Sequence, residues 1–446
     1  KTDGSGALSW INNAGGAIDG LSDAKSGGTN FTNSMLIGHQ TTGTLDNAQH
    51  NTGIGGASLD ALTSGDWNTA VGSSALTSNT TGESNTGIGL NTLYNNQGGD
   101  KNTAIGGNAL FQNVSGDYNV GVGYKALNAT TTGNYNAAVG ANALYSNTTG
   151  NYNTASGYHS LYSNTTGTKN IAIGHGAYDQ ADTEHNNLAI GFSALGGAIA
   201  GGEYNIAIGN YSLAANTTGD HNIGIGYGSL DDNTTGNLNT ALGGYTLFKN
   251  TTGNNNVAIG NYSLRENTTG NNNTATGSAS LVSNTTGNNN TASGREALHR
   301  NTTGNFNTAT GRHSLYFNTE GEYNTGTGYG TLYSNTTGSK NTAIGFNSLF
   351  ANTEAYNNTA LGFYAGDGIT TGNNNVMLGY GTDPSAVDGT NQIVIGKDAT
   401  GQADHSVVLG NANVTAVYAS QDAGATVYAG GLNLGGTAVT ATAAEL

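Results

Sequence analysis

The stretch NTASGYHSLYSNTTGTKNIAIGHGAY, residues 153–178, decides the fold. Its opening pattern, Asn-x-Ala-x-Gly, returns 17 residues later at Asn170. When the sequence is aligned on the glycine that closes this pattern, steps of 17 run from Gly38 to Gly191 and again from Gly209 to Gly396. One extra residue within 196–203 separates the two series, which together contain 22 repeats.

The composition is unusual for a globular protein. Of 446 residues, 73 are Gly, one is Pro and none is Cys, and Asn and Thr are abundant. High polarity and a high Gly content favour disorder. A disordered chain has no reason to keep a count of 17, so the period instead predicts structural units that stack on one another.

Each repeat reads as one coil of a solenoid. We number it from its Asn, which is present in 20 of the 22 repeats. Position two is Thr or an aliphatic residue, three is Ala or Gly, four is usually Ile, Val or Leu, and five is Gly. Position nine is Leu in 17 of the 19 repeats that start between Asn51 and Asn358. Asn-Thr-Thr-Gly follows in ten repeats, and we expect a turn there because Asn and Gly tolerate a left-handed backbone.

Two short strands and two turns fit into 17 residues, so we predict an all-β, parallel β-solenoid of about 22 coils of 17 residues. Stacking places position four over position four and Leu over Leu, and we expect both rows to be buried. The Asn of position one should form a ladder that satisfies its amide through the coils above and below. At about 4.8 Å per coil, the rod would be roughly 105 Å long.

Position three is only Ala or Gly in the repeats that start between Asn51 and Asn358. Small residues allow another backbone to approach closely. We interpret this row as the one by which several chains pack about a common axis. The alternative is that small residues let the two sides of one narrow coil close up.

The repeats at 340–345 (KNTAIG) and 255–260 (NNVAIG) resemble the head repeat of the trimeric autotransporter adhesins. The resemblance implies a homotrimeric, left-handed parallel β-roll. The usual repeat of that family is shorter, as is the last step here, from Gly396 to Gly410. KTDGSGALSW at the start of the chain and LNLGGTAVTATAAEL at its end resemble segments of bacteriophage tail-fibre proteins, which often end in an endosialidase-type intramolecular chaperone.

These resemblances imply a structural protein, a virion tail fibre that attaches a particle to its host. The expected partners are two further copies of the chain, a host cell-surface glycan or protein receptor, and other fibre or baseplate proteins. The expected location is the virion or another extracellular or cell-surface site. The alternatives are a bacterial surface adhesin or filament subunit, an ice-binding solenoid with rows of Thr, and a polysaccharide-cleaving tailspike.

Composition and motifs argue against several other functions. A formal charge of -16 opposes binding to a phosphate backbone, and no apolar run is long enough to insert into a membrane. The nine His residues show no metal-ligand spacing, and the pair Asp231–Asp232 reads as turn charge rather than as an acid and a base. We therefore predict no catalytic residue, no metal site and no cofactor.

Two rows of side chains are candidates for binding. Aromatic residues at position ten would stack on the sugar faces of a polysaccharide, or else cover the turn beneath them. Position four becomes polar in four successive coils, where hydroxyls inside the coil would hold water or an anion, or else bond to one another. The first row includes Tyr145, Tyr162, Tyr316, Tyr333 and Phe350, and the second is Thr276, Ser293, Thr310 and Thr327.

The chain divides into three parts. Residues 1–33 form a Gly/Ser-rich N-terminal capping segment in which Trp10 would dock on the first coil or on a preceding module. Residues 34–410 form the coils. Residues 411–446 alternate polar and apolar side chains over short stretches, which predicts a β transition into a further fibre module.

Overall fold

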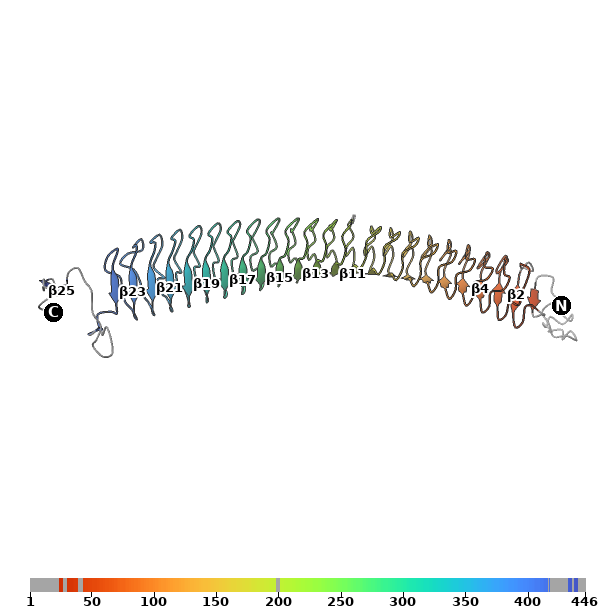
Figure 1. The fold of residues 1–446 in the computed structure, drawn as a ribbon, viewed down its shortest axis with the longest axis horizontal. Helices are drawn as coiled ribbons and strands as arrows, with labels where there is room; N and C mark the ends of the chain where they lie inside the picture. Colours follow the sequence, from red (N-terminus) through yellow and green to blue (C-terminus); the bar gives the residue numbers. More distant parts are fainter. Residues whose placement is uncertain are drawn as a thin grey trace, which may run out of the picture.

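A computed structural model describes residues 24–26, 30–38, 43–197, 201–415, 417, 432–434 and 437–439. These residues form a long, gently bowed rod of stacked coils, with the strands along one side and the turns along the other (Figure 1). No helix occurs among them, and the predicted all-β parallel solenoid of about 22 coils is confirmed. Each coil holds one strand rather than the expected two, because positions six to ten form consecutive turns. Trp10 and most of the C-terminal alternating stretch lie outside the described residues.

All strands are three residues long and most occupy positions two to four of a coil. They are β1 (Ala24–Ser26), β2 (Met35–Ile37), β3 (Thr52–Ile54), β4 (Thr69–Val71), β5 (Thr86–Ile88), β6 (Thr103–Ile105), β7 (Val120–Val122), β8 (Ala137–Val139), β9 (Thr154–Ser156), β10 (Ile171–Ile173), β11 (Leu188–Ile190), β12 (Ile206–Ile208), β13 (Ile223–Ile225), β14 (Thr240–Leu242), β15 (Val257–Ile259), β16 (Thr274–Thr276), β17 (Thr291–Ser293), β18 (Thr308–Thr310), β19 (Thr325–Thr327), β20 (Thr342–Ile344), β21 (Thr359–Leu361), β22 (Val376–Leu378), β23 (Ile393–Ile395), β24 (Val407–Leu409), β25 (Leu432–Leu434) and β26 (Thr437–Val439).

Strands β2 to β24 pair in parallel, each with the next along the chain, so equivalent positions stack in columns. The register survives the extra residue, since Ile190 of β11 still faces Ile208 of β12. The insertion is therefore absorbed in the turns and not in the sheet. At the N-terminal end β1 pairs antiparallel with β2, and β25 and β26 form a separate antiparallel pair.

The structure differs from the prediction in which side chains of each strand face the interior of the coil. Position three is buried and position four is exposed, as in the pattern of Val257, Ala258 and Ile259. The interior is so narrow that a Cβ added at Gly224 would lie 2.6 Å from the hydroxyl of Ser212. Leu at position nine fills what space remains and is fully buried, as at Leu264. The Ala/Gly row therefore closes the chain's own coil, and its interpretation as a contact between chains is wrong.

The predicted Asn ladder of position one is confirmed, and Asn273 shows its pattern. Its Oδ1 accepts hydrogen bonds from the backbone N–H of Asn290 at 3.0 Å and from that residue's Nδ2 at 3.2 Å. Its own Nδ2 donates to Oδ1 of Asn256 at 3.2 Å and to the carbonyl of Gly287 at 2.8 Å. Every buried polar atom of this side chain is thus used, which is the condition for tolerating an amide in a dry interior.

A second Asn ladder runs at position twelve, which is the Asn of Asn-Thr-Thr-Gly. Asn284 is buried; its Nδ2 donates to Oδ1 of Asn267 at 2.7 Å and to the carbonyl of Gly287 at 3.0 Å. Both ladders therefore converge on the carbonyl of position fifteen. The expectation that these Asn and Gly residues adopt a left-handed backbone is wrong, because neither Asn284 nor Gly287 has a positive φ.

Left-handed residues instead occur at positions seven, nine and seventeen, and most are not glycine. Leu264 has φ 50° and Asn272 has φ 57°. Such a conformation costs a residue other than glycine about 1–2 kcal/mol. Burial of a Leu side chain contributes about 1.5–3 kcal/mol, which is enough to offset the cost at position nine.

The second ladder is interrupted where the next coil lacks Asn. Oδ1 atoms of Asn113, Asn164 and Asn352 are buried without a partner. The residues above them at position twelve are Thr130, Ala181 and Ile369. In the coil of Ala181, the larger Tyr178 replaces the Leu of position nine, and its hydroxyl accepts a hydrogen bond of 2.6 Å from Nδ2 of Asn187. Burial of this hydroxyl raises the pKa of Tyr178.

We expect Thr130→Asn to stabilise the rod. The new amide would complete the ladder by donating to Oδ1 of Asn113 and accepting from Asn147, whose Nδ2 now donates to Gly150 alone. The expected gain in the free energy of unfolding is about 1–3 kcal/mol, measured by urea denaturation. Thr130→Val removes the unpaired hydroxyl without completing the ladder, so it should gain less. Equal stability of the two variants would contradict the ladder as the cause.

Candidate functional site

One side of the rod exposes a largely apolar surface, which we call the sheet face, and hydroxyl residues interrupt its aliphatic row at position four in five coils. It consists of the outward side chains at positions two, four, six and seventeen. Ile259, at position four, is 39% exposed, and the aliphatic residues of that row in most other coils are exposed to a similar extent. Almost all the large apolar side chains that are exposed in the described residues belong to this face or to its border at position seven.

Aromatic columns border the sheet face on both sides. At position seventeen Tyr135 stacks on Tyr118 and Tyr152, with ring centroids 4.9 and 5.1 Å away. At position six Phe346 stacks on Tyr329 and Phe363, at 5.2 and 4.9 Å. The column at position seventeen was not identified in the sequence, because its aromatics alternate with Asn, Lys, Ser and His and follow no simple motif.

The four hydroxyl residues predicted to line the interior lie on the sheet face instead. Each occupies position four of its coil, which is the last residue of the strand, and is exposed. The prediction of an interior row is wrong for the same reason as at Ile259: position three, and not position four, points inward. Together with the Thr residues of position two, they form a polar window in an otherwise apolar surface. The four are Thr276, Ser293, Thr310 and Thr327.

The aromatic residues at position ten are half-buried and stack on one another. Tyr145 and Tyr162 have centroids 5.1 Å apart and planes inclined by 7°. Tyr333 lies between Tyr316, at 5.3 Å, and Phe350, at 5.0 Å, with planes inclined by 17° and 1°. A ring inside such a column presents its edge and not its face to solvent. The arrangement favours packing along the turn over the stacking of sugars on the ring faces, and sugar binding by this row stays a prediction.

The coils that begin at Asn290 and Asn307 are rich in Arg, and three Glu residues of the same coils, Glu296, Glu320 and Glu322, balance the formal charge. Three of the four Arg residues of the chain, Arg295, Arg300 and Arg312, lie there. Glu296 accepts hydrogen bonds from Arg295 at 3.0 Å and from His313 at 2.7 Å. Burial by itself would raise the pKa of Glu296. The hydrogen bonds and charges of His313 and Arg295 outweigh that effect, so the pKa of Glu296 is lowered. No ion pair to Arg300 or Arg312 occurs among the described residues.

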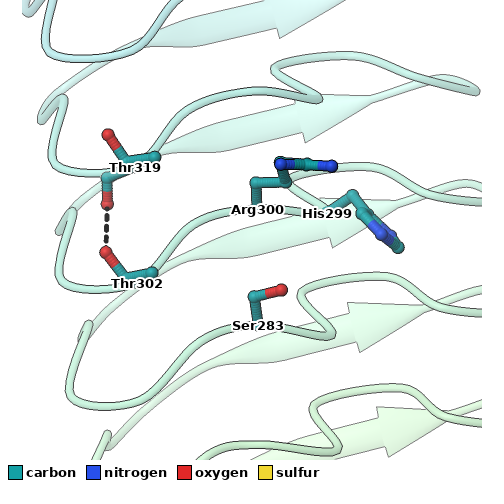
Figure 2. Close-up of a pocket in the computed structure, with 5 residues that line it drawn as sticks. All are labelled: Ser283, His299, Arg300, Thr302 and Thr319. Carbon is teal, nitrogen blue, oxygen red and sulfur yellow. Dashed lines mark hydrogen bonds between the residues drawn. The ribbon is translucent and has the colours of Figure 1, made fainter.

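A hollow of about 310 Å³ lies beside Arg300, on the turns and away from the sheet face. It is lined by Ser283, His299, Arg300, Thr302 and Thr319. Figure 2 shows Arg300 and His299 toward one end of the hollow, Thr302 and Thr319 toward the other, and Ser283 in the neighbouring coil. No sequence motif marks this site, because its residues come from three successive coils.

Arg300 is held from one side only. Its guanidinium lies over the ring of Phe317, 5.1 Å from the centroid. Phe317 and Ser283 are the residues at the same repeat position in the coils after and before it. Because Ser283 is small, the space on its side of the guanidinium stays open. The hollow therefore opens where the column changes from the small Ser283 to the larger Arg300 and Phe317.

The carboxylates of Asp231 and Asp232 influence each other electrostatically. Burial, together with the neighbouring charge of Asp232, raises the pKa of Asp231 to about 6. That this pair has no catalytic role stays a prediction. In the part of the chain that the structure describes, no group of three His, Asp or Glu side chains is arranged to hold a metal ion. The described residues include no helix long and apolar enough to cross a bilayer.

The Asn-Thr-Thr sequons place their Asn in the second ladder. Asn147, Asn267 and Asn335 are fully buried and hydrogen-bonded. A glycan cannot be attached to a side chain in this position once the coil has formed. The sequons are therefore structural in the folded rod.

A scan against protein-family models and a search of curated proteins both return no match to this chain.

Proposed function

We propose that the chain is the subunit of a homotrimeric fibre, a virion tail fibre that attaches a particle to a host surface. The observation that carries this proposal is the sheet face: a rod of stacked coils exposes aliphatic side chains at position four in 17 of its 22 coils, all on one side. An exposed surface of this kind marks a contact with another molecule. A second and third copy of the same rod match it in length and repeat.

The size of the sheet face supports a stable contact. A strip about 105 Å long and three residues, or about 10 Å, wide has an area on the order of 1,000 Å². The largest apolar patch on a monomer is about 300–600 Å², whereas a standard interface buries about 800 Å² per partner. The number three comes from the resemblance to the trimeric autotransporter heads.

A stiff trimer also suits an attachment function. Three identical chains would present identical sites at fixed positions, so that weak contacts add through effective concentration. An ice-binding surface is less well supported, because only one of the two turn threonines keeps a free hydroxyl. That of Thr268 donates to the carbonyl of Thr285 at 3.0 Å, whereas Thr269 is exposed.

We expect the full chain to sediment as a trimer and Ile259→Asp together with Ile344→Asp to give monomers. Each substitution would place three carboxylates within an apolar contact, where their desolvation is unfavourable. The matched control is Thr269→Asp with Thr337→Asp, which puts the same charge on the exposed turns. A monomeric wild-type chain, or dissociation of the control as well, would refute the assembly through the sheet face.

Antibodies against the rod can separate the fibre from its closest alternative, a bacterial surface adhesin. Immunogold labelling of virus particles from a lysate of the source culture would support the tail fibre. Labelling of intact cells without particles would instead support the adhesin.

A further inference from the structure

We propose that the hollow beside Arg300 binds an acidic sugar of the host surface through its carboxylate. The inference rests on the proposed attachment function and names the class of receptor. The site is formed by the five side chains that line the hollow, in a part of the chain that holds three of its four Arg residues.

The anionic part of the ligand is indicated by Arg300. This guanidinium makes no ion pair within the described residues and packs over the ring of Phe317. A guanidinium presents a planar fork of N–H donors that matches a carboxylate. The nearest carboxylate on its own column, Glu266, lies two coils away and is already paired with Lys249 and Arg265, both at 2.6 Å.

The sugar part is indicated by the other side chains. Oγ1 of Thr302 donates to the carbonyl of Thr319 at 3.1 Å, and Oγ1 of Thr319 donates likewise to Thr336 at 3.1 Å. Both hydroxyls keep lone pairs that can accept hydrogen bonds. When Nδ1 of His299 donates to the carbonyl of Ala279, 3.2 Å away, its Nε2 is an acceptor too.

These acceptors discriminate between ligands. A deprotonated phosphate or sulfate ion offers few donors, so acceptors would add little to its binding. A sugar ring offers several hydroxyl donors in addition to its charged group. The combination of one cation with several acceptors, in a hollow of about 310 Å³, therefore fits a monosaccharide unit that carries a carboxylate.

Three carboxylates lie in the same two coils as Arg300 and Thr319, namely Glu296, Glu320 and Glu322, and Glu320 is the one next to a residue of the hollow along the chain. Glu320 is exposed and follows Thr319 directly along the chain. Its carboxylate would repel that of the sugar across solvent, with an effect that weakens as salt is added. Glu320→Gln should therefore strengthen binding a few-fold at low salt.

The test is calorimetric titration of the full chain with oligogalacturonate, with neutral maltooligosaccharide and inorganic phosphate as comparison ligands. We expect oligogalacturonate to bind and both comparison ligands to bind at least about ten-fold more weakly. Arg300→Gln should lower the affinity at least about ten-fold, because a charge-assisted contact is lost. Arg312→Gln is the matched control, since Arg312 is also unpaired but lies outside the hollow, and it should leave the affinity unchanged.

A second variant tests the role of the hollow itself rather than the charge of Arg300. Ser283→Phe fills the hollow, and the fold tolerates Phe at this repeat position because Phe317 occupies it two coils further on. It should abolish binding while the thermal unfolding curve stays that of the wild type. Equal loss in Arg300→Gln and Arg312→Gln, binding by Ser283→Phe, or equal affinity for phosphate would each overturn the proposal.

Failure of the sugar site and failure of the proposed attachment function give different results. A chain that binds oligogalacturonate but is found neither on particles nor on cells would refute the attachment function and leave the site. A chain found on particles that binds no acidic sugar would refute the site alone.

Discussion

Gly277→Ala is expected to disrupt the stacking of its own coil on the next one. The residue has φ 129°, a backbone conformation that side chains strongly disfavour. A Cβ there would also lie 2.7 Å from the carbonyl carbon and oxygen of Gly294 in the next coil. Strain and overpacking together should lower the free energy of unfolding by about 3–6 kcal/mol. Thermal unfolding and limited proteolysis, with cleavage expected near this coil, would measure the effect.

Gly176→Ala is the matched control. Gly176 has φ 59°, and no atom lies within 3.4 Å of the Cβ that alanine would add. Ala279 occupies the same repeat position with φ 56°. The control should therefore cost no more than about 1–2 kcal/mol. If both variants unfold alike, close contact between stacked glycines is not what makes position five invariant.

Asn273→Ala is expected to have the second large effect. The substitution removes the acceptor for two donors of Asn290 and the donor for Oδ1 of Asn256 and the carbonyl of Gly287. Each of the four lost hydrogen bonds contributes about 0.5–1.5 kcal/mol, and the backbone N–H of Asn290, which has no other partner, is left unsatisfied in the dry interior at a cost of about 1–3 kcal/mol. We expect a loss of about 3–6 kcal/mol in the free energy of unfolding, measured by urea denaturation.

Asn271→Ala provides the control within the same turn. Its side chain makes a similar set of contacts, with the backbone of Asn254 at 2.8 Å, Thr269 at 2.8 Å and Asn288 at 3.1 Å. Asn271 is only partly buried, so water can replace these partners. A loss below about 1 kcal/mol is expected. A control as damaging as Asn273→Ala would show that burial does not set the cost.

Much of the fold could be predicted from the sequence because the repeat has a fixed period along the chain. The glycine of position five recurs in every repeat, and a fixed count of 17 permits a parallel stack in which each coil contacts only its neighbours. The buried Leu row and the first Asn ladder follow from that stack alone. The mixed row of position seventeen and the hollow beside Arg300 could not be found in this way, because they depend on side chains brought together from different coils.

Which side of each strand faces inward was decided by the tertiary structure. Local alternation allows either side to be buried, since position three is small and position four is apolar. The Leu of position nine settles the choice, because it packs across the coil against position three: a Cβ at Gly121 would lie 3.5 Å from Cγ of Leu110. Larger residues, Met377 and Val394, occupy position three only in coils whose position nine is Asp383 or Thr400. The aliphatic row is then forced outward, where it becomes the sheet face.

At the turn, too, the sequence determined some features and left others open. By itself it determined that the chain is a solenoid of 17-residue coils, because period and glycine spacing are properties of the chain alone. Only the tertiary structure decided that Asn-Thr-Thr-Gly turns its Asn inward as a second ladder. For Asn284 the carbonyl of Gly287 is only three residues away, but Oδ1 of Asn267 belongs to the preceding coil, and no local pattern brings these two amides together.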